Sequence, residues 1–288
     1  MSVREPAVAG TFYKADPEDL RVEIEACFLG AGGPGKLPGA GPRGAGRIVG
    51  LISPHAGFIY SGPTAAHGYY RLAENDLPKV AVLLGPNHRG YGAPAAVGTH
   101  PAWRTPLGRV ELDTAIARGI ISSSRFAQED SSAHQLEHSL EVQLPFLQYI
   151  TGDSAVRIVP ILVGISAWDG DSEAVVRDLG EAVAGALEGQ DAIVVASTDF
   201  THYESQQSAQ RKDSEAIRRI IELDEMGLLE IVRRMDISMC GVVPTAVSIA
   251  ACKRLGAKSA RELAYRTSGD VTDDYAQVVG YASIELDR

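Results

Sequence analysis

The stretch IVGLIS at residues 48–53 leads directly into Pro54 and His55. An uninterrupted apolar run of this length, ended by a turn residue, is typical of a strand buried on both faces of a parallel sheet. In open α/β sheets, ligands bind beyond the carboxyl ends of such strands. His55 therefore follows a predicted strand at the place where a site is expected.

Two further apolar runs end in the same way. VAVLLG at residues 80–85 is followed by His88, and AIVVAS at residues 192–197 is followed by His202. A single loop histidine is usually an ordinary polar residue, but three at equivalent strand ends can converge, because parallel strands end at one edge of a sheet. We therefore predict one site built from these three loops.

The order of the predicted elements indicates an α/β fold. A further strand is expected at residues 156–163, and the segments between the strands are long enough for helices. Asp16, followed by a proline and two acidic residues, is typical of a helix start and predicts a helix over residues 17–28. We expect a single domain over residues 1–288, with a three-layer arrangement of helices on both faces of a mainly parallel central sheet.

Three other segments have a clear pattern. Residues 30–46 hold eight glycines and three prolines, which predicts a mobile loop. Residues 213–234 form an amphipathic helical pattern with an expected break near Gly227. Residues 275–286 alternate enough to predict a closing strand.

The composition of the chain disfavours nucleic-acid-binding, membrane-spanning and secreted proteins. The net charge of −10 and the lack of a basic cluster disfavour nucleic acid as a partner. The apolar runs are too short to span a membrane, and charges spread through the first thirty residues disfavour a secretory signal. Three scattered cysteines suit a reducing compartment, so we expect a cytoplasmic protein.

The histidines and one cysteine suggest metal chemistry. Neutral imidazole is a common metal ligand, and two histidines with one anionic ligand leave coordination positions open. Cys240 precedes Gly241, whose missing side chain permits a close backbone approach to a ligand. A buried structural cysteine is the alternative there. Cys27 and Cys252 lie in helical patterns and are expected in the core.

Asp199 and His202 form a candidate acid/base pair. Their spacing lets a carboxylate and an imidazole meet in a tight turn, which would fix the imidazole tautomer and leave its other nitrogen free to move a proton. The alternative is that Asp199 only caps a helix.

A rival site lies at His134-Gln135-Leu136-Glu137-His138. This matches the H-x-x-E-H pattern, in which a helical histidine pair binds zinc and the glutamate acts as base. Pro145 would end such a helix soon afterwards, and Glu141 is the only further ligand nearby. Short patterns of this kind also arise by chance.

Together these residues resemble the Memo family, also called AmmeMemoRadiSam system protein B, which is similar to the class III extradiol ring-cleaving dioxygenases. The resemblance runs nearly from end to end of the chain. It is carried by PAVAGTFY at residues 6–13, PHAG at 54–57 with Tyr60 and Gly62, GPNH at 85–88, TPLG at 105–108, EHSLE at 137–141, STD at 197–199 with His202, and MCG at 239–241.

The resemblance implies roles for individual residues. The implied metal ligands are His55, His88 and Cys240, and the implied catalytic residues beside the metal are Asp199 and His202. It places Phe12 on the pocket wall, where Tyr60 is also expected to contact substrate, and makes Glu137, His138 and Glu141 supporting residues. That supporting role for Glu137, His138 and Glu141 lowers the weight of the zinc-protease pattern, and His134 falls outside the family's motif.

One departure from the dioxygenase pattern affects the choice of metal. Those enzymes hold Fe(II) with two histidines and a carboxylate, whereas here Cys240 takes the third place. Thiolate is softer and more easily oxidised than carboxylate, so it accepts copper or zinc as well as iron. Iron(II) is the expected cofactor, with copper and zinc as alternatives.

Three functions follow as hypotheses. The leading one is a non-haem iron, dioxygenase-like redox protein that acts on a small aromatic substrate, with His202 as the base. The second is a non-catalytic pocket that binds a phosphotyrosine-like or other anionic group on a protein partner. The third is a zinc hydrolase. The family name also implies a radical SAM protein as a partner.

Overall fold

One mixed sheet organises the chain. The computed structural model describes residues 2–39, 48–75, 77–152 and 156–288. Within these residues the main sheet has the strand order β10 (Ser259–Thr267), β11 (Val278–Asp287), β1 (Ile48–Ser53), β8 (Ala192–Ser197), β2 (Val80–Pro86), β7 (Arg157–Val163), β3 (Ala95–Val97) and β6 (Ala127–Glu129), and β9 (His202–Glu204) pairs with β11.

The centre of this sheet is parallel. Strands β1, β8, β2 and β7 run side by side in the same direction, with Gly50 opposite Val194 and Val82 opposite both Val194 and Val159. The flanking pairs of β1 with β11, β10 with β11 and β3 with β7 are antiparallel. Because the central strands are parallel, their carboxyl ends meet at one edge, where a site was predicted.

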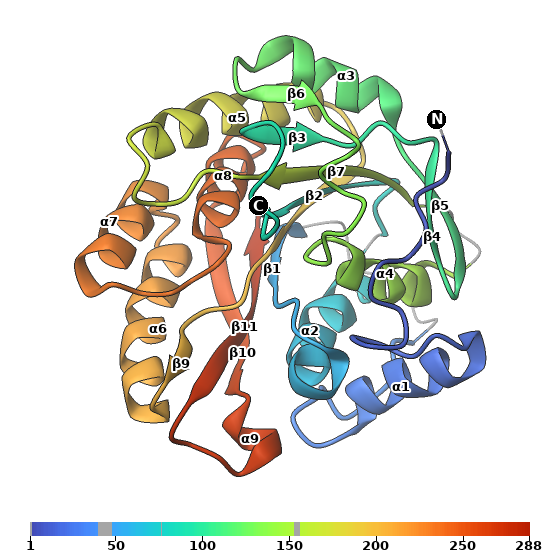
Figure 1. Ribbon diagram of the computed structural model, residues 1–288, viewed down its shortest axis with the longest axis vertical. Helices are drawn as coiled ribbons and strands as arrows, with labels where there is room; N and C mark the ends of the chain where they lie inside the picture. The colour runs from blue at the N-terminus through green and yellow to red at the C-terminus, as the bar shows by residue number, and fades with distance from the viewer. Residues whose placement is uncertain (1, 40–47, 76, 153–155) are drawn as a thin grey trace.

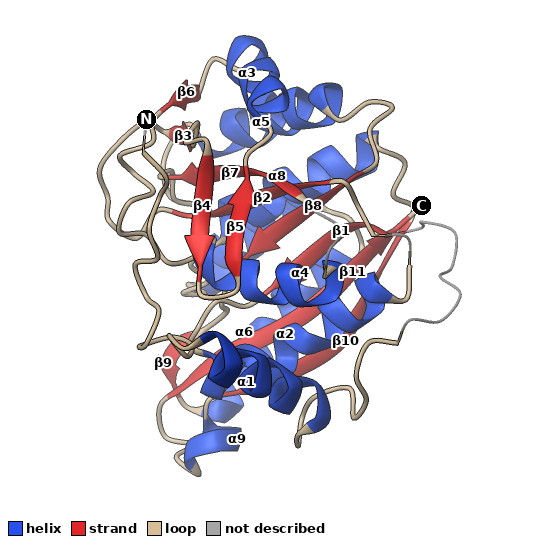
Figure 2. Cartoon of the chain, turned by 90° about the vertical axis from the view of Figure 1, so that its right-hand side faces the viewer, coloured by secondary structure: helices blue, strands red, loops and turns tan. Residues whose placement is uncertain are grey.

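Helices cover both faces, so the predicted three-layer α/β fold is confirmed (Figure 1). The cluster on one face includes residues of α3 (Thr114–Ser123), α5 (Ser172–Ala186), α6 (Gln206–Ile221), α7 (Glu225–Met235) and α8 (Val242–Arg254). The cluster on the other includes residues of α1 (Pro17–Leu29), α2 (Phe58–Ala73), the 3-10 turn η1 (Glu141–Gln143) and α4 (Leu144–Thr151). Figure 2 shows α1, α2 and α4 on the near side of the sheet, below the hairpin of β4 (Ala102–Thr105) and β5 (Gly108–Glu111). The short α9 (Gly269–Thr272) lies between β10 and β11.

Strand β2 shows why the central strands are apolar throughout. Its side chains alternate between the faces: Val82 and Leu84 join the cluster under α5 and α8, whereas Ala81 and Leu83 join the cluster under α2 and α4. Both faces of the strand are shielded from solvent, so apolar residues are favoured at every position. This is the pattern that predicted the strand.

The predicted elements near the site match closely. β1 and β8 have the expected bounds, and β2 and β7 each differ from their predicted bounds by one residue at one end. Helix α1 starts where expected, because the Asp16 side chain accepts hydrogen bonds from the amides of Glu18 and Asp19. The predicted closing strand is β11, which begins later than expected, at Val278.

The helical region at residues 213–234 differs from its prediction. It consists of two helices, and the chain turns between them at Leu223, which has a φ of 53°. Gly227, where the break was expected, lies inside α7, and its amide donates to the Asp224 side chain. Asp224 caps α7, so the helix begins earlier than the glycine suggested.

The glycine-rich stretch is described only in part. Residues 31–39 have no helix or strand, and the Gly35 amide donates to the Phe28 carbonyl at the end of α1. The rest of the predicted loop, residues 40–46, lies outside the described residues.

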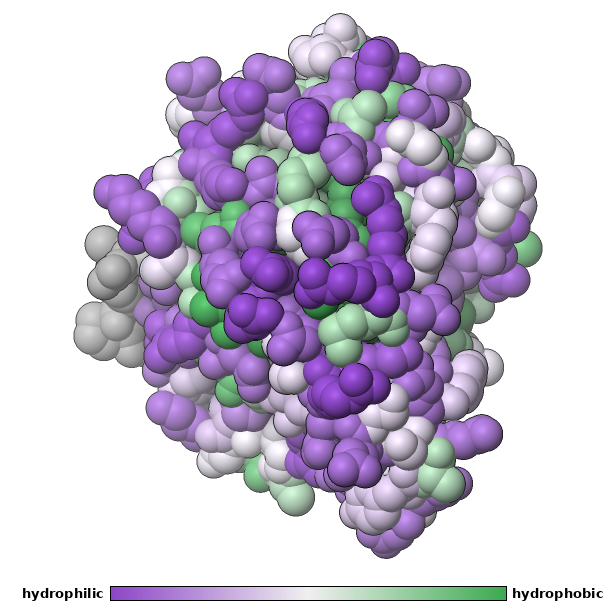
Figure 3. All heavy atoms as spheres, turned by 90° about the vertical axis from the view of Figure 1, so that its left-hand side faces the viewer, coloured by the Kyte–Doolittle hydropathy of each residue, from purple (hydrophilic) through white to green (hydrophobic). Residues whose placement is uncertain are grey.

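The face that carries α5, α6 and α7 is mainly hydrophilic, with small scattered hydrophobic areas (Figure 3). Among the described residues, no helix is both long and apolar enough to cross a bilayer.

Candidate metal centre

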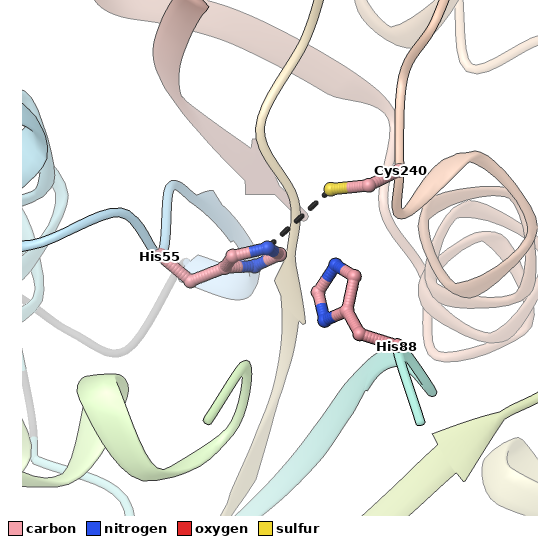
Figure 4. Close-up of side chains that lie close together, drawn as sticks. All are labelled: His55, His88 and Cys240. Carbon is pink, nitrogen blue, oxygen red and sulfur yellow. Dashed lines mark hydrogen bonds between the residues drawn. The ribbon is translucent and has the colours of Figure 1, made fainter. Parts of the chain in front are cut away.

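Three side chains predicted as ligands meet at the carboxyl edge of the sheet. His55 follows β1, His88 follows β2, and Cys240 lies just before α8. One nitrogen of each imidazole and the Cys240 sulfur lie within 4.8 Å of one another. The Cys240 Sγ is 3.4 Å from the His55 Nε2, and the two rings stand nearly perpendicular, 5.2 Å apart (Figure 4).

A glycine lets Cys240 reach this edge. A Cβ on Gly241 would lie 2.6 Å from the Ser197 carbonyl oxygen and 2.6 Å from the Thr198 Cβ, which is closer than real contacts allow. The Gly241 amide also donates to the Thr198 Oγ1. The close approach predicted at Gly241 is therefore an approach to the end of β8, and it brings the sulfur over the strand ends.

Glu137 orients His88. Its carboxylate accepts from the His88 Nδ1 at 2.9 Å and from the His88 amide at 2.7 Å, and it also accepts from the amides of His138 and Ser139. Burial raises the pKa of Glu137, but the His88 hydrogen bond and charge and the Ser139 amide outweigh it, so the pKa is about 2. An ionised partner at Nδ1 holds the proton there and leaves Nε2 as an acceptor.

His55 is suited to act as a neutral ligand. Its side chain is buried, and burial together with the nearby His88 and His138 lowers its pKa well below the usual value. It therefore stays neutral at pH 7, the form in which imidazole binds metals.

Asp199 lies beside Cys240. Its Oδ1 accepts from the His55 amide at 2.8 Å, and its own amide donates to the Cys240 Sγ at 3.3 Å. Burial raises the pKa of Asp199 to about 6, against the opposing hydrogen bond from His55 and the charge of His202. This carboxyl can therefore gain or lose a proton near neutral pH.

Cys240 differs from the other cysteines in its surroundings. Burial raises the pKa of its thiol, and the Asp199 charge adds to this, so the thiol is neutral unless a cation is near. Cys27 and Cys252 are buried in α1 and α8, and burial raises the pKa of each to about 12. Their predicted place in the core is confirmed.

His202 does not pair with Asp199 as the spacing suggested. Its Nδ1 lies 2.7 Å from the Phe200 carbonyl oxygen and 2.9 Å from the Ser238 carbonyl oxygen. Because carbonyls only accept, the proton is on Nδ1 and Nε2 carries the lone pair. The tautomer is thus fixed by the main chain. Asp199 caps no helix either, since the chain continues into β9.

Aromatic rings line one side of the centre. Phe12 contacts His138 with ring centroids 4.7 Å apart, and His138 stacks on His88 at 4.8 Å. His138, expected behind the ligands, therefore lies among them, and burial lowers its pKa to about 4. Tyr60 lies in the first turn of α2 and is 40% exposed.

Glu141 supports the site from further away. Its buried carboxylate pairs with Arg4 and accepts from the amides of Ala7 and Val8 and from the Tyr13 hydroxyl. It therefore holds the segment that carries Phe12.

The rival zinc pattern is not assembled. Residues 132–140 form turns rather than the helix that the pattern requires. The His134 Nε2 lies 3.0 Å from the Ala96 carbonyl oxygen, and its ring contacts Trp103. His134 therefore faces the core, while Glu137 and His138 group with His88.

Two site residues that lie behind His55 were not identified from the sequence. Ser197 and Gln143 are both buried and join a hydrogen-bonded chain that reaches the His55 Nδ1. Ser197 belongs to a matched motif, but its contact was not anticipated. Gln143 gives no local signal, because a buried glutamine reads as an ordinary helical surface residue.

Comparison with known proteins shows a family model and relatives that match nearly the whole chain. A family model described as "Memo-like protein" matches residues 4–285. A MEMO1 family protein of Methanopyrus kandleri is 50% identical over 287 residues, which cover 99% of each chain. Another, of Methanothermobacter thermautotrophicus, is 45% identical over 284 residues, covering 98% of this chain and 99% of the relative.

A solved structure shares the fold. The crystal structure of an uncharacterized protein from Escherichia coli K12 superposes with a TM-score of 0.51 at 13% identity, covering 83% of this chain and all, 100%, of that one. At this identity the likeness concerns the fold alone.

Proposed function

This chain belongs to the Memo-like family, and from that premise we propose that it is a metal-dependent redox protein. His55, His88 and Cys240 hold the ion, which is iron(II), and the substrate is a small aromatic compound. The observation that carries the proposal is the approach of three ligand atoms to within 4.8 Å of one another at the strand ends.

The donors fit a metal ion. His88 offers an Nε2 lone pair because its Nδ1 proton is held in a hydrogen bond to Glu137, and His55 stays neutral because of its burial. Cys240 supplies the anionic donor when a cation favours its thiolate. Two imidazoles and one anionic ligand are the set that leaves open positions on non-haem iron(II).

When bound, the ion would supply a Lewis acid and a redox centre with positions for substrate and oxygen. His202 takes a proton from a substrate hydroxyl, because its Nδ1 proton is held by the Phe200 and Ser238 carbonyls and its Nε2 is free. Asp199, with a pKa of about 6, can pass a proton in the same place. Phe12 and Tyr60 offer aromatic surface to the substrate.

The test combines metal content with oxygen uptake. Protein is purified and loaded with iron(II) without oxygen, and oxygen uptake is then followed with catechol as the probe. His202→Gln is expected to keep the iron and lose at least 10²-fold in uptake rate, the scale of a general base. His67→Gln, on α2, is the matched control and should match the wild type.

The other hypotheses give distinct results. Stoichiometric zinc with anaerobic ester hydrolysis would favour the hydrolase. Binding of phenyl phosphate without metal or turnover would favour the phosphotyrosine-like pocket. Either result would contradict the redox proposal.

A further inference from the structure

A buried chain of hydrogen bonds lies behind His55. Ser197 Oγ, at the end of β8, is 2.9 Å from the His55 Nδ1, 2.8 Å from the Gln143 Nε2 and 2.6 Å from the Ser139 carbonyl oxygen. All of these residues are buried and are at most 2% exposed. The direction of each hydrogen bond can therefore be worked out from its donors and acceptors.

The amide of Gln143 has one possible orientation. Its Nε2 lies 2.9 Å from the Pro54 carbonyl oxygen, and its Oε1 accepts from the Tyr69 hydroxyl at 2.7 Å. Turning the amide over would set Oε1 against the Pro54 carbonyl, which has no proton to give. Gln143 therefore points its NH₂ group at both Pro54 and Ser197.

The Ser197 hydroxyl has a single proton, and only one partner requires it. The Ser139 carbonyl can only accept, and at 2.6 Å two oxygens without a proton between them would repel. Ser197 consequently donates to Ser139 and accepts from the Gln143 NH₂ group. Toward His55 it has only a lone pair left to offer.

We infer that Ser197 and Gln143 are positioning residues that hold His55 in the Nδ1-protonated tautomer. The Nε2 lone pair then faces the Cys240 Sγ, 3.4 Å away, and is presented to the metal. This step rests on the proposed metal site. A tautomer fixed in advance spares the protein the cost of moving the proton when the ion binds.

Residues of one turn determine the tautomers of both histidine ligands. Glu137 accepts a hydrogen bond from the Nδ1 of His88. Two residues later, the Ser139 carbonyl accepts the hydrogen bond of the Ser197 hydroxyl, which leaves Ser197 only a lone pair for His55. The Ser139 Oγ also donates to the Pro86 carbonyl at the end of β2. The turn at residues 137–139 thus fixes the protons of two ligands that come from different strands.

The tautomer can be measured without any metal. Full-length protein labelled with ¹⁵N-histidine is kept metal-free and reduced at mildly alkaline pH, and long-range ¹H–¹⁵N correlations report which ring nitrogen of His55 is protonated. His55→Gln assigns the signal. The variants are Ser197→Ala and Gln143→Met, with Ser283→Ala as a control, since Ser283 is an equally buried serine of β11. Ser197→Thr restores a hydroxyl.

The wild type and Ser283→Ala should show only the Nδ1-protonated form. Ser197→Ala and Gln143→Met should show a mixture or the Nε2-protonated form, and Ser197→Thr should recover the wild-type pattern. Iron(II) affinity, measured by competition with a chromophoric chelator, should fall about 10–100-fold in the first two variants.

An Nε2-protonated His55 in the wild type, or an unchanged tautomer and affinity in both variants, would overturn the inference. If the tautomers behave as expected and the wild type binds no metal, the proton arrangement stands and the proposed function fails. The two ideas are therefore separable in one set of samples.

Discussion

The Nδ1 of His88 lies 2.9 Å from the Oε1 of Glu137, and the amide of the same histidine donates to the other carboxylate oxygen at 2.7 Å. Glu137 thus binds both the ring and the backbone amide of His88. These two contacts fix the orientation and the tautomer of the His88 ring.

Replacing this carboxylate should weaken the metal site. The His88 ring and the amides of His138 and Ser139 all donate to the Glu137 carboxylate. Glu137→Gln replaces one carboxylate oxygen by an NH₂ group, which cannot accept, so at least one donor is left unpaired. We expect iron(II) affinity to fall about 10–100-fold. The measurement is chelator competition, with exposed Glu230→Gln on α7 as control. Equal affinities for Glu137→Gln and the wild type would show that His88 needs no such partner.

The close contact at Gly241 should make an alanine there costly. Gly241→Ala drives a Cβ to 2.6 Å from the Ser197 carbonyl oxygen, so the segment with Cys240 must move. We expect a loss of about 1–3 kcal/mol in the free energy of unfolding, with weaker metal binding.

Gly185 gives a matched control for that change. It is an exposed glycine inside α5, and a Cβ there meets no atom of the described residues within 4 Å. Gly185→Ala should stabilise the protein by about 0.5–1 kcal/mol, because alanine favours a helix. Urea denaturation measures both variants, and effects of the same sign would contradict the packing argument.

The buried pair of Arg4 and Glu141 should be costly to break. Arg4 also donates to the carbonyls of His134 and Glu137, so it fastens the N-terminal segment to the site turn. Arg4→Met leaves the Glu141 charge without its cation, and we expect a loss of about 3–5 kcal/mol in unfolding free energy. Exposed Arg104→Met, whose ion pair with Glu5 lies in water, should change stability by less than about 1 kcal/mol. Urea midpoints that agree between the two would refute the distinction.

Acid should destabilise the protein partly through His134. Burial lowers the pKa of His134 from 6.5 to about 3, and the charges of Arg4 and His100 add to this. Below pH 6.5 the unfolded chain binds a proton that the folded one refuses, so unfolding free energy falls by about 1.4 kcal/mol per pH unit. His134→Gln removes this titration.

Between about pH 7.5 and pH 5.5, the wild type should therefore lose about 1.4 kcal/mol more than His134→Gln, measured by urea denaturation. The variant should also keep its iron, because His134 faces the core. Parallel pH profiles would mean that His134 is protonated in the folded protein. Loss of iron would revive the H-x-x-E-H site.

The central sheet could be predicted because burial on both faces leaves a plain mark on the sequence. β2 and β8 are unbroken apolar runs, and each ends at a turn. Strand β10 leaves no such mark, because it lies at the sheet edge and carries charged residues such as Arg261 and Glu262 on exposed positions. β3 and β6, at three residues each, are too short for any period to emerge.

The site was predictable as far as strand ends decide it. His55 follows β1 and His88 follows β2, and these two strands flank β8 in the parallel part of the sheet, so their approach follows from topology. The side-chain partners did not follow. Asp199 binds the His55 amide rather than His202, because main-chain carbonyls already occupy the His202 Nδ1. Gln143 contacts Pro54, which is distant in sequence, and no local sequence pattern indicates such a contact.

Metal K-edge X-ray absorption on protein loaded with iron(II) without oxygen tests the metal site most directly. We expect near-stoichiometric iron with one sulfur and two imidazole ligands. The sulfur should disappear in Cys240→Ser and remain in Cys252→Ser, which alters a buried cysteine of α8. A wild type without a sulfur ligand, or a spectrum that Cys240→Ser leaves unchanged, would show that Cys240 does not bind the metal.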